Sequence, residues 1–250
     1  MFLGFEGIEN VRDLGGLLRI DGAKIKPGLL LRTGRLEKAT DADIGRLTAM
    51  GLSAIVDFRD RDEVRRAPDR EVPGAAYYNL PALPALQDNF KPVDDPSYTA
   101  EEVHRDFRRI YRFLAQSDEA LETYAAFFRI LLASEGKPVL WHCTQGKDRT
   151  GVAALLLLTA LGIDESVIFR DYMLTNEFTQ RTLDAFASME EPPFGLDMAR
   201  EVFLVYEDNL KFYVNCLEIE YGSVMNYLEL ALGVGPDEIE TLERYYLEWD

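Results

Sequence analysis

The chain has 250 residues, 47% of them hydrophobic, and its 44 acidic and 27 basic residues give a net charge of −17. This length and apolar content can bury one sizeable core, and no low-complexity linker divides the sequence, so we expect a single domain over residues 1–250. The acidic balance argues against nucleic acid and against an anionic membrane surface as partners, so any anionic ligand must bind a local cationic site.

The two cysteines, Cys143 and Cys216, do not make a disulfide framework in a chain of this length, which predicts reduced thiols inside a cell. The N-terminus lacks a basic stretch followed by an apolar one, and the apolar run VAALLLLTALGI is too short to span a bilayer. We therefore expect a cytoplasmic protein without stable membrane insertion.

The first third of the chain alternates between strand-like and helix-like segments. Asp21-Gly22 lies between two apolar runs and is typical of a hairpin turn. A capping pattern that starts at Thr40 predicts a helix ending at Gly51. Short runs rich in apolar, β-branched or aromatic residues predict strands over 53–58 and 75–81.

Residues 81–96 are rich in Pro, Asp and Asn and have no periodicity, which predicts a loop. Helical spacing resumes over 100–134 and is interrupted near 116–118, which predicts two helices. We therefore expect an insertion at about 81–134 that contains a loop and a helical lid.

The segment HRDFRRIYR (104–112) carries four arginines in an otherwise acidic chain. Such a run is usually a solvated helix face. The alternative is a lid over an anionic site, in which case replacing Arg105, Arg108 and Arg109 would raise KM for an anionic substrate.

KPVLWHC (137–143) is typical of a buried strand, and RTGVAALLLLTALG (149–162) predicts an apolar helix. Strands alternate with helices up to this point, and only helical patterns follow it. The sequence therefore predicts an α/β fold with a mainly parallel central sheet flanked by helices and a helical C-terminal third. The later helical patterns cover 164–176, 178–189, 197–211, 222–233 and 236–249.

The loop between this strand and this helix has the composition of an anion-binding site. A strand, a loop and a helix N-terminus in succession aim backbone N–H groups at one point. Gly146 lets the backbone approach a ligand, Lys147 adds a point charge, and Arg149 can donate two N–H groups to phosphate oxygens.

Cys143 lies at the mouth of the same positive loop, which favours its thiolate form and makes it a nucleophile near neutral pH. A phosphate ester bound there would meet an attacking sulfur. The loop amides and Arg149 would stabilise the transition state, so neither a metal nor another cofactor is required. The alternative is a structural cysteine buried at a strand end.

Residues 142–151, HCTQGKDRTG, resemble the signature of protein tyrosine phosphatases. The GKDR core is similar to the bacterial group of tyrosine and lipid phosphatases typified by a mycobacterial enzyme. Further matches follow the order of that family over nearly the whole chain, namely 10–16 (NVRDLGG), 31–34 (LRTG), 57–59 (DFR) and 221–233. The sequence departs from commoner spellings at Val11, Thr33, Phe58 and Gln145. Only Gln145 lies in the loop, where it could alter substrate preference.

The resemblance implies a metal-independent cysteine phosphatase with Cys143 as the nucleophile and Arg149 as the phosphate clamp. Thr150 would hydrogen-bond the leaving thiolate when the phosphocysteine is hydrolysed. The residues implied to form the phosphate cradle are Thr144, Gln145, Gly146, Lys147 and Asp148.

The sequence contains no Trp-Pro-Asp tripeptide that would supply a general acid. Asp148, which lies beside the scissile bond in this group, is the first candidate, and Asp57, at the end of a strand, is the second. Arg149 and Lys147 favour the ionised form of Asp148, but bound phosphate offsets that effect. The alternative for Asp148 is a hydrogen-bond acceptor that stabilises the loop.

Other polar residues have structural interpretations beside the functional ones. His142 is expected to hold the loop, because a cysteine that is already ionised needs no base. Arg32 and Arg59 would either line the cleft or form ion pairs. Cys216 has no surroundings that would bind an anion and is expected to be a packed core thiol.

The expected substrates are phosphotyrosine proteins. Phosphoinositides or inositol phosphates are the alternative, because Lys147 suits a second phosphate, and phosphoserine and phosphothreonine remain open. A phosphate-binding pseudophosphatase is disfavoured because Cys143, Arg149 and a candidate acid are all present. Sulfur transfer of the rhodanese type is disfavoured by His142 and by the arginine six positions after the cysteine.

Overall fold

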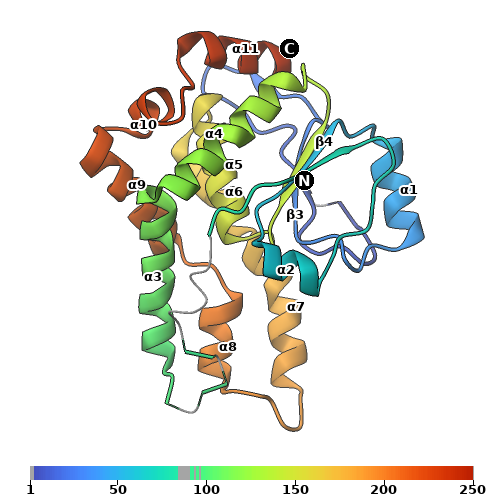
Figure 1. Cartoon of the computed structure of the whole chain (residues 1–250), viewed down its shortest axis with the longest axis vertical. Helices are drawn as coiled ribbons and strands as arrows, with labels where there is room; N and C mark the ends of the chain where they lie inside the picture. Colours follow the sequence, from blue (N-terminus) through green and yellow to red (C-terminus); the bar gives the residue numbers. More distant parts are fainter. Residues whose placement is uncertain (1–2, 84–90, 93, 96, 250) are drawn as a thin grey trace.

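The computed structural model describes residues 3–83, 91–92, 94–95 and 97–249, and a five-stranded sheet lies at its centre (Figure 1). The strand order is β1-β3-β6-β4-β5, with β1 antiparallel to β3 and the other neighbours parallel. The predicted, mainly parallel sheet is therefore confirmed. The strands are β1 (Arg12–Asp13), β3 (Leu30–Thr33), β6 (Val139–His142), β4 (Ala54–Asp57) and β5 (Ala76–Asn79).

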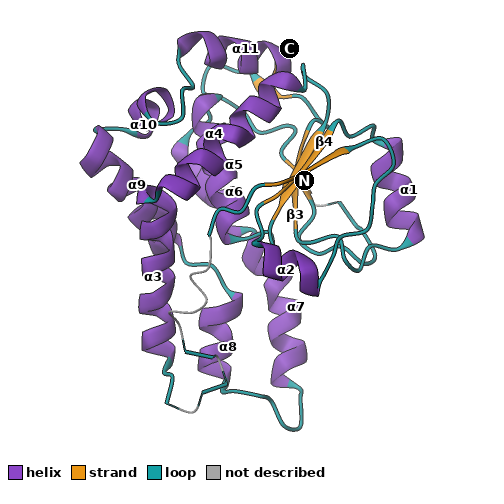
Figure 2. Ribbon diagram, in the orientation of Figure 1, coloured by secondary structure: helices purple, strands orange, loops and turns teal. Residues whose placement is uncertain are grey.

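Helices flank the sheet and fill the C-terminal third, as predicted (Figure 2). A separate two-stranded sheet pairs β2 (Lys24–Ile25) with β7 (Leu247–Glu248) and so joins the two ends of the chain. The helices are α1 (Asp41–Ala49), α2 (Arg61–Arg66), α3 (Ala100–Gln116), α4 (Asp118–Ala133), α5 (Asp148–Ala160), α6 (Glu165–Met173), α7 (Thr175–Ala187), α8 (Leu196–Phe203), α9 (Glu207–Tyr221), α10 (Val224–Leu230) and α11 (Pro236–Tyr246).

The central strands are buried on both faces, and successive side chains alternate between two cores. On β6, Val139 and Trp141 join the large core that α4 and α5 complete, whereas Leu140 joins a smaller core that contains Leu47 of α1. This two-sided burial explains why the strand reads as an uninterrupted apolar run in the sequence.

The strands β3, β4 and β6 end at the same edge of the sheet. Their register places Thr33 and Asp57 beside His142. In open α/β sheets, ligands bind at this carboxyl edge. The loop that the sequence predicts to bind an anion follows β6 directly, so it lies at the edge where a ligand is expected.

The helix predicted after Thr40 is confirmed, because Thr40 and Asp43 form a reciprocal capping box at the start of α1. A second capping box, formed by Asp60 and Glu63, begins α2. This helix lies in a charged segment whose sequence has no apolar periodicity, so only the capping pattern indicates it.

The pattern over 197–211 predicts one helix, but the structure contains two, with α8 ending at Phe203 and α9 beginning at Glu207. The side chain of Asn176 donates to the carbonyl of Val205 at 2.9 Å and accepts from its N–H at 2.8 Å. These bonds hold Val205 outside both helices, so a tertiary contact overrides the local helical pattern.

The helices α3, α7 and α8 extend away from the sheet on the side of α2 (Figure 1). Part of their packing is in small clusters separate from the main core, which contain Val103 and Met198 in one case and Leu183 and Phe186 in the other. The interruption predicted near 116–118 is confirmed, because Ser117 separates α3 from α4. Much of the loop predicted over 81–96 lies outside the described residues.

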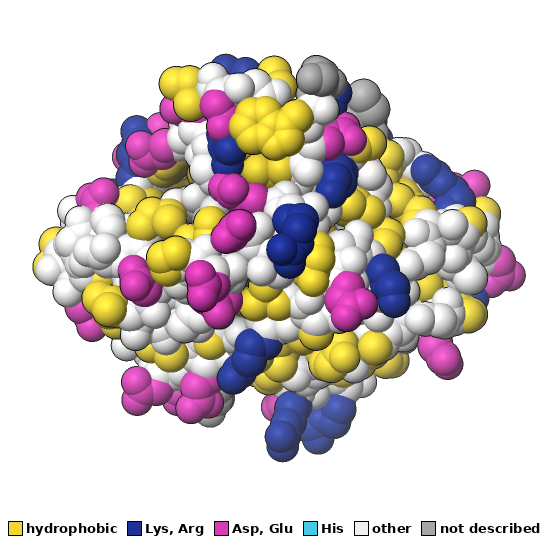
Figure 3. Space-filling model, turned by 90° about the horizontal axis from the view of Figure 1, so that it is seen from above, with side chains coloured by type: hydrophobic (Ala, Val, Ile, Leu, Met, Phe, Trp, Pro, Cys, Tyr) yellow, Lys and Arg dark blue, Asp and Glu magenta, His cyan; other side chains and the backbone are white. Residues whose placement is uncertain are grey.

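Within the part of the chain that the structure describes, no helix has the length and apolar character needed to cross a membrane. On the face seen in Figure 3, acidic and basic side chains are interspersed with apolar ones. The negative net charge is therefore not gathered into one continuous patch on that face.

Candidate active site

The loop 143–147 connects β6 to α5 at the carboxyl edge of the sheet. Gly146 has a left-handed φ of 68°, and a Cβ atom on it would lie 2.3 Å from the carbonyl oxygen of Thr33. A side chain at Gly146 is therefore excluded both by backbone conformation and by space. The loop packs directly on the end of β3, which fixes its path.

The carbonyl groups of the loop bind the surrounding protein. The Asn10 side chain donates to the carbonyls of Gln145 and Gly146, both at 3.0 Å. Arg32 donates to the same Gly146 carbonyl at 3.0 Å. The backbone N–H of Arg35 donates to a further loop carbonyl, that of Thr144, at 3.1 Å. The carbonyl side of the loop is thus satisfied by β1, β3 and their flanking residues.

The N–H groups of the loop have no such partners. Among the described residues, no protein acceptor lies at hydrogen-bond distance from the backbone N–H groups of residues 144 to 149. Unpaired N–H groups in a buried loop are rare, because leaving them unpaired costs free energy. N–H groups arranged in this way beside the N-terminus of α5 suit an anion, which is the role that the sequence predicts for the loop.

Cys143 is the first residue of this loop, and only 2% of it is exposed. On the first turn of α5, the hydroxyl of Thr150 is buried and has no hydrogen-bond partner among the described residues. A buried hydroxyl that lacks a partner is costly, which fits the predicted role of Thr150 toward the leaving thiolate. Cys216 packs in the main core, as expected for a thiol without a chemical role.

The guanidinium of Arg149 is held by Glu63, a residue of α2 to which no catalytic motif points. Its two terminal nitrogens donate to the two carboxylate oxygens of Glu63 at 2.6 and 2.8 Å. The Thr144 hydroxyl donates to the same carboxylate. Burial opposes ionisation, but Arg149 holds the pKa of Glu63 well below its usual range. The capping pattern from Asp60 to Glu63 was the available signal for this residue.

Asp148 is held at the start of α5 by a tyrosine of α3. The Tyr111 hydroxyl donates to one oxygen of Asp148 at 2.8 Å and lies 2.6 Å from the hydroxyl of Tyr172. Burial raises the pKa of both tyrosines well above the ordinary value, so both remain neutral. The Asp148 side chain is 16% exposed, so it is accessible as well as oriented.

The side chain of Lys147 is buried, and its charge is used by other parts of the protein. The ammonium donates to the carbonyls of Val202 and Leu204 at the end of α8. It also lies 4.6 Å from the centre of the Phe107 ring on α3. Burial lowers the pKa of Lys147, and Asp148 opposes that effect. In this conformation, Lys147 is therefore not the free cation expected for a second phosphate.

Asp57 and Arg59 form an ion pair that is fully buried. The Arg59 guanidinium bridges Asp57 and Asp69, with one nitrogen 2.7 Å from each carboxylate. Tyr77 donates to Asp57 at 2.7 Å. Asp57 is 0% exposed and surrounded by donors, so this geometry disfavours it as the general acid. Arg59 likewise forms an ion pair and does not line a cleft.

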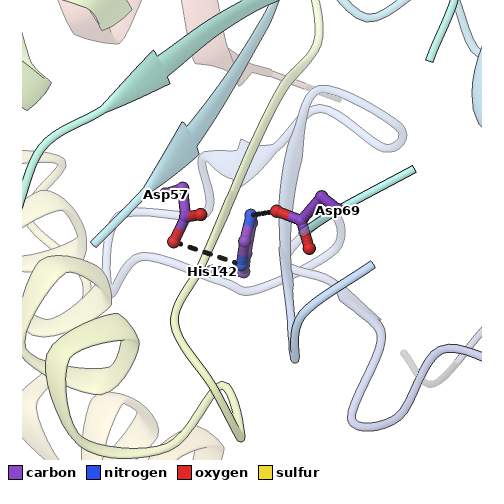
Figure 4. A group of neighbouring side chains, drawn as sticks. All are labelled: Asp57, Asp69 and His142. Atoms are coloured by element: carbon purple, nitrogen blue, oxygen red, sulfur yellow. Dashed lines mark ion pairs between the residues drawn. The ribbon is translucent and has the colours of Figure 1, made fainter. Parts of the chain in front are cut away.

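His142 lies between Asp57 and Asp69 in this buried network (Figure 4) and directly precedes Cys143 in the chain. Its Nε2 lies 3.1 Å from Asp69, and its Nδ1 lies 3.1 Å from the carbonyl of Cys143. Burial alone would lower the pKa of His142, but Asp57 and Asp69 raise it overall. These two neighbours fix the orientation of the ring, which supports the expectation that His142 holds the loop.

Asp57, Asp69 and His142 also have ligand atoms within 4.8 Å of one another, close enough to hold a metal ion. Arg59 already bridges the two carboxylates. A divalent cation would have to displace this guanidinium from both carboxylates. The donor set therefore fits a buried ion-pair network better than a metal site.

Arg32 and Arg12 share the carboxylate of Asp171 on α6, at 2.6 and 3.2 Å. Arg12 also donates to Asn10 at 2.8 Å. Burial and the neighbouring Arg32 lower the pKa of Arg12 to about 9. Of the two interpretations of Arg32, the ion pair is the one that the structure contains. The same guanidinium donates to the Gly146 carbonyl and so helps to hold the loop.

The arginines of α3 do not face the loop. Phe107 and Tyr111, one turn apart on α3, are the residues that contact Lys147 and Asp148. Helical geometry places Arg105 and Arg109 on the opposite face, where they pair with acidic residues of α3 itself. Arg108 lies over an aromatic ring of α9. These contacts favour the solvated helix face over direct contact with an anionic substrate.

The fold, the phosphate loop and its cysteine point to one class of protein, and comparison with known sequences agrees. A sequence model of the tyrosine phosphatase family matches residues 3–248. The chain therefore belongs to the tyrosine phosphatase family, and the predicted class of cysteine-dependent phosphatase is confirmed.

Individual relatives place the chain among bacterial members. A putative tyrosine-protein phosphatase of Cupriavidus necator is 35% identical over 98% of this chain and 88% of its own length. The triple specificity protein phosphatase PtpB of Mycobacterium tuberculosis is 28% identical over 86% of this chain and 84% of its own. A crystal structure of TpbA from P. aeruginosa covers 76% of this chain and 88% of its own at 15% identity, and its TM-score of 0.30 is too low to add to the fold argument.

Proposed function

We propose that the protein hydrolyses phosphotyrosine in proteins through a phosphocysteine intermediate on Cys143. The observation that carries this proposal is the loop after β6. Its carbonyls accept hydrogen bonds from surrounding residues, whereas its N–H groups, beside Cys143 and Arg149, have no protein acceptor in the part of the chain that the structure describes. Such a loop binds the equatorial oxygens of a phosphoryl group. The names of the relatives, which are tyrosine-protein phosphatases or a phosphatase of triple specificity, support the same substrate class.

In the first step, the Cys143 thiolate attacks phosphorus, so an S–P bond forms while the ester P–O bond breaks. Asp148 gives its proton to the leaving oxygen. In the second step, water attacks phosphorus and Asp148 takes up a proton from that water. The S–P bond breaks, Thr150 hydrogen-bonds the departing thiolate, and inorganic phosphate leaves.

The preference for phosphotyrosine over phosphoinositides follows from the position of Lys147. A second phosphate on the substrate needs a further cation near the loop. The ammonium of Lys147 is bound to backbone carbonyls of α8, so it does not supply that cation. The position of Lys147 therefore supports a substrate with a single phosphate.

The test compares turnover of a phosphotyrosine peptide, a phosphoserine peptide and a phosphoinositide in the presence of EDTA. Wild-type protein should prefer the phosphotyrosine peptide, and Cys143→Ser should lose at least about 10³-fold in kcat. Cys216→Ala removes the other thiol and should retain wild-type activity. Rapid acid quenching with a labelled substrate should trap phosphate on wild-type protein and none on Cys143→Ser.

Three results would each contradict the proposal in a different way. Activity that EDTA abolishes would indicate a metal-dependent reaction. Turnover that survives in Cys143→Ser would exclude the phosphocysteine. A phosphoinositide that is hydrolysed faster than the peptide would overturn the substrate assignment while leaving the mechanism intact.

A further inference from the structure

Lys147 links the phosphate loop to the outer helices. Its backbone belongs to the loop, and its ammonium reaches the carbonyls of Val202 and Leu204 at the end of α8. The side chain is 3% exposed, so these bonds form inside the protein and not at its surface. A buried lysine is costly unless its charge is satisfied, so this position has a specific use for the charge.

The contact suits the chemistry of a helix C-terminus. The last carbonyls of a helix have no partner within it, and the end carries a partial negative charge. The helix α8 has no side-chain cap at its N-terminus, where Gly195 precedes it, and it spans only eight residues. The ammonium of Lys147 therefore binds α8 at its C-terminal end, in addition to the apolar clusters that α8 forms with its neighbours.

The helix α8 in turn packs against α3. Val202 of α8 and Phe107 of α3 pack on the same small apolar cluster, which also contains Val103 and Met198. One turn along α3 from Phe107, Tyr111 donates to Asp148. Two consecutive residues, Lys147 of the loop and Asp148 of α5, are thus bound by the packed pair of α3 and α8.

We propose that Lys147 is a positioning residue that fastens α8 and α3 to the phosphate loop, and that this attachment orients Asp148 through Tyr111. Lys147 then affects proton transfer to the leaving group, through the orientation of Asp148, and does not affect the binding of the phosphoryl group. The expected effect on turnover rests on the proposed function, but the attachment of the helices is independent of it.

The test uses the full-length protein with Lys147→Met, which removes the charge and keeps the length of the side chain. Hydrogen exchange should become at least about tenfold faster in residues 196–205, while residues 152–160 of α5 stay protected. The kcat for the phosphotyrosine peptide should fall by about tenfold or more, and the inhibition constant for inorganic phosphate should change less than about twofold. Lys211→Met, at an exposed lysine of α9, should match wild type in all three measurements.

Two further variants separate the steps of the proposal. Lys147→Arg keeps a cation that can donate to the carbonyls, so it should restore much of the protection of residues 196–205. Tyr111→Phe removes the bonds of the Tyr111 hydroxyl to Asp148 and Tyr172 and leaves the bonds from Lys147 to α8 intact. It should therefore lower kcat while exchange in 196–205 stays at the wild-type rate.

Several outcomes would overturn the proposal. Unchanged exchange in residues 196–205 would show that Lys147 does not fasten α8. If exchange in Lys147→Met rose equally in residues 152–160, Lys147 would have a general role in the fold. The same conclusion would follow if Lys147→Met did not fold and Lys147→Arg did not restore the protection of residues 196–205. An inhibition constant for phosphate that rises tenfold without a change in exchange would show that Lys147 binds substrate. A protein without phosphatase activity would overturn the proposed function, whereas the exchange results would still decide the attachment.

Discussion

The carboxylate of Glu63 and the guanidinium of Arg149 form a two-point ion pair, with oxygen to nitrogen distances of 2.6 and 2.8 Å. Two parallel bonds fix the plane of the guanidinium as well as its position. Arg149 is therefore held in one orientation, in which its terminal nitrogens also lie within hydrogen-bond distance of the Phe58 carbonyl and the Thr144 hydroxyl.

Replacing Glu63 with Gln should remove this orientation while keeping the size of the side chain. We expect kcat/KM for the phosphotyrosine peptide to fall by about 10²-fold, because the clamp must be ordered during each turnover. Steady-state kinetics measure the effect. Asp62→Asn, an exposed neighbour on α2, is the control and should match wild type. Wild-type kcat/KM in Glu63→Gln would show that Arg149 needs no such support.

The identity of the general acid can be tested with leaving groups of different basicity. Asp148→Asn should slow a substrate with a basic leaving group, such as phenyl phosphate, by about 10²-fold or more, because that oxygen needs a proton to depart. Hydrolysis of p-nitrophenyl phosphate, with its weakly basic leaving group, should slow much less. Asp57→Asn should affect both substrates equally and lower the stability, since Asp57 is buried in an ion pair. If the dependence on the leaving group appeared in Asp57→Asn and not in Asp148→Asn, the two roles would be reversed.

The raised pKa of His142 makes the stability of the protein depend on pH. The charged imidazole stabilises the folded state fully below its unfolded pKa of about 6.5, and this contribution is lost as the pH rises through the higher folded pKa. Urea unfolding should therefore show stability falling from about pH 6.5 upward, by about 1.4 kcal/mol for each unit by which the pKa is raised. Asp69→Asn removes the partner at Nε2 and should flatten this dependence. Asp41→Asn, at an exposed ion pair, should leave it unchanged, and an equally steep curve in Asp69→Asn would exclude this origin.

A comparison of two glycines with similar backbone angles can separate the cost of a left-handed backbone from the cost of a steric clash. Gly146 and Gly74 have φ values of 68° and 88°, but only at Gly146 would a Cβ meet the backbone of Thr33. Both Gly→Ala variants should lose roughly 1–2 kcal/mol of stability from the left-handed conformation. Only Gly146→Ala should lose phosphate binding as well, as measured by the inhibition constant for inorganic phosphate. Equal phosphate binding in both variants would show that the path of the loop tolerates a side chain.

Much of the fold was accessible from the sequence because its signals are local. The apolar runs of β4 and β6 and the capping box of α1 depend on neighbouring residues, and the structure confirms them. The break before α9 was not accessible, because it depends on Asn176, which is distant in the sequence from Val205. The short strand β7 likewise exists only through pairing with β2 at the other end of the chain.

In the candidate site, too, local features could be predicted from the sequence and contacts between distant residues could not. The motif from Cys143 to Thr150 is continuous in the sequence, so its loop could be predicted, although the roles of its residues remain predictions. The direction in which Lys147 points and the partner of Arg149 depend on α8 and α2, which meet the loop only after folding. Charge suggested that Lys147 suits a second phosphate, and for the arginines of α3 it left a solvated helix face and a lid over an anionic site as alternatives. The structure shows that nearby carbonyls and carboxylates compete for those charges.

The position of Asp171 makes the buried arginines of the sheet depend on α6. This single carboxylate, on α6, forms ion pairs with two buried arginines that come from β1 and β3. A fragment that stopped after α5 would keep both guanidiniums and lose their counter-ion, along with the α6 packing that excludes water from them. The part of the chain before α6 therefore depends on this helix for its stability, and we expect no shortened version that ends before α6 to fold.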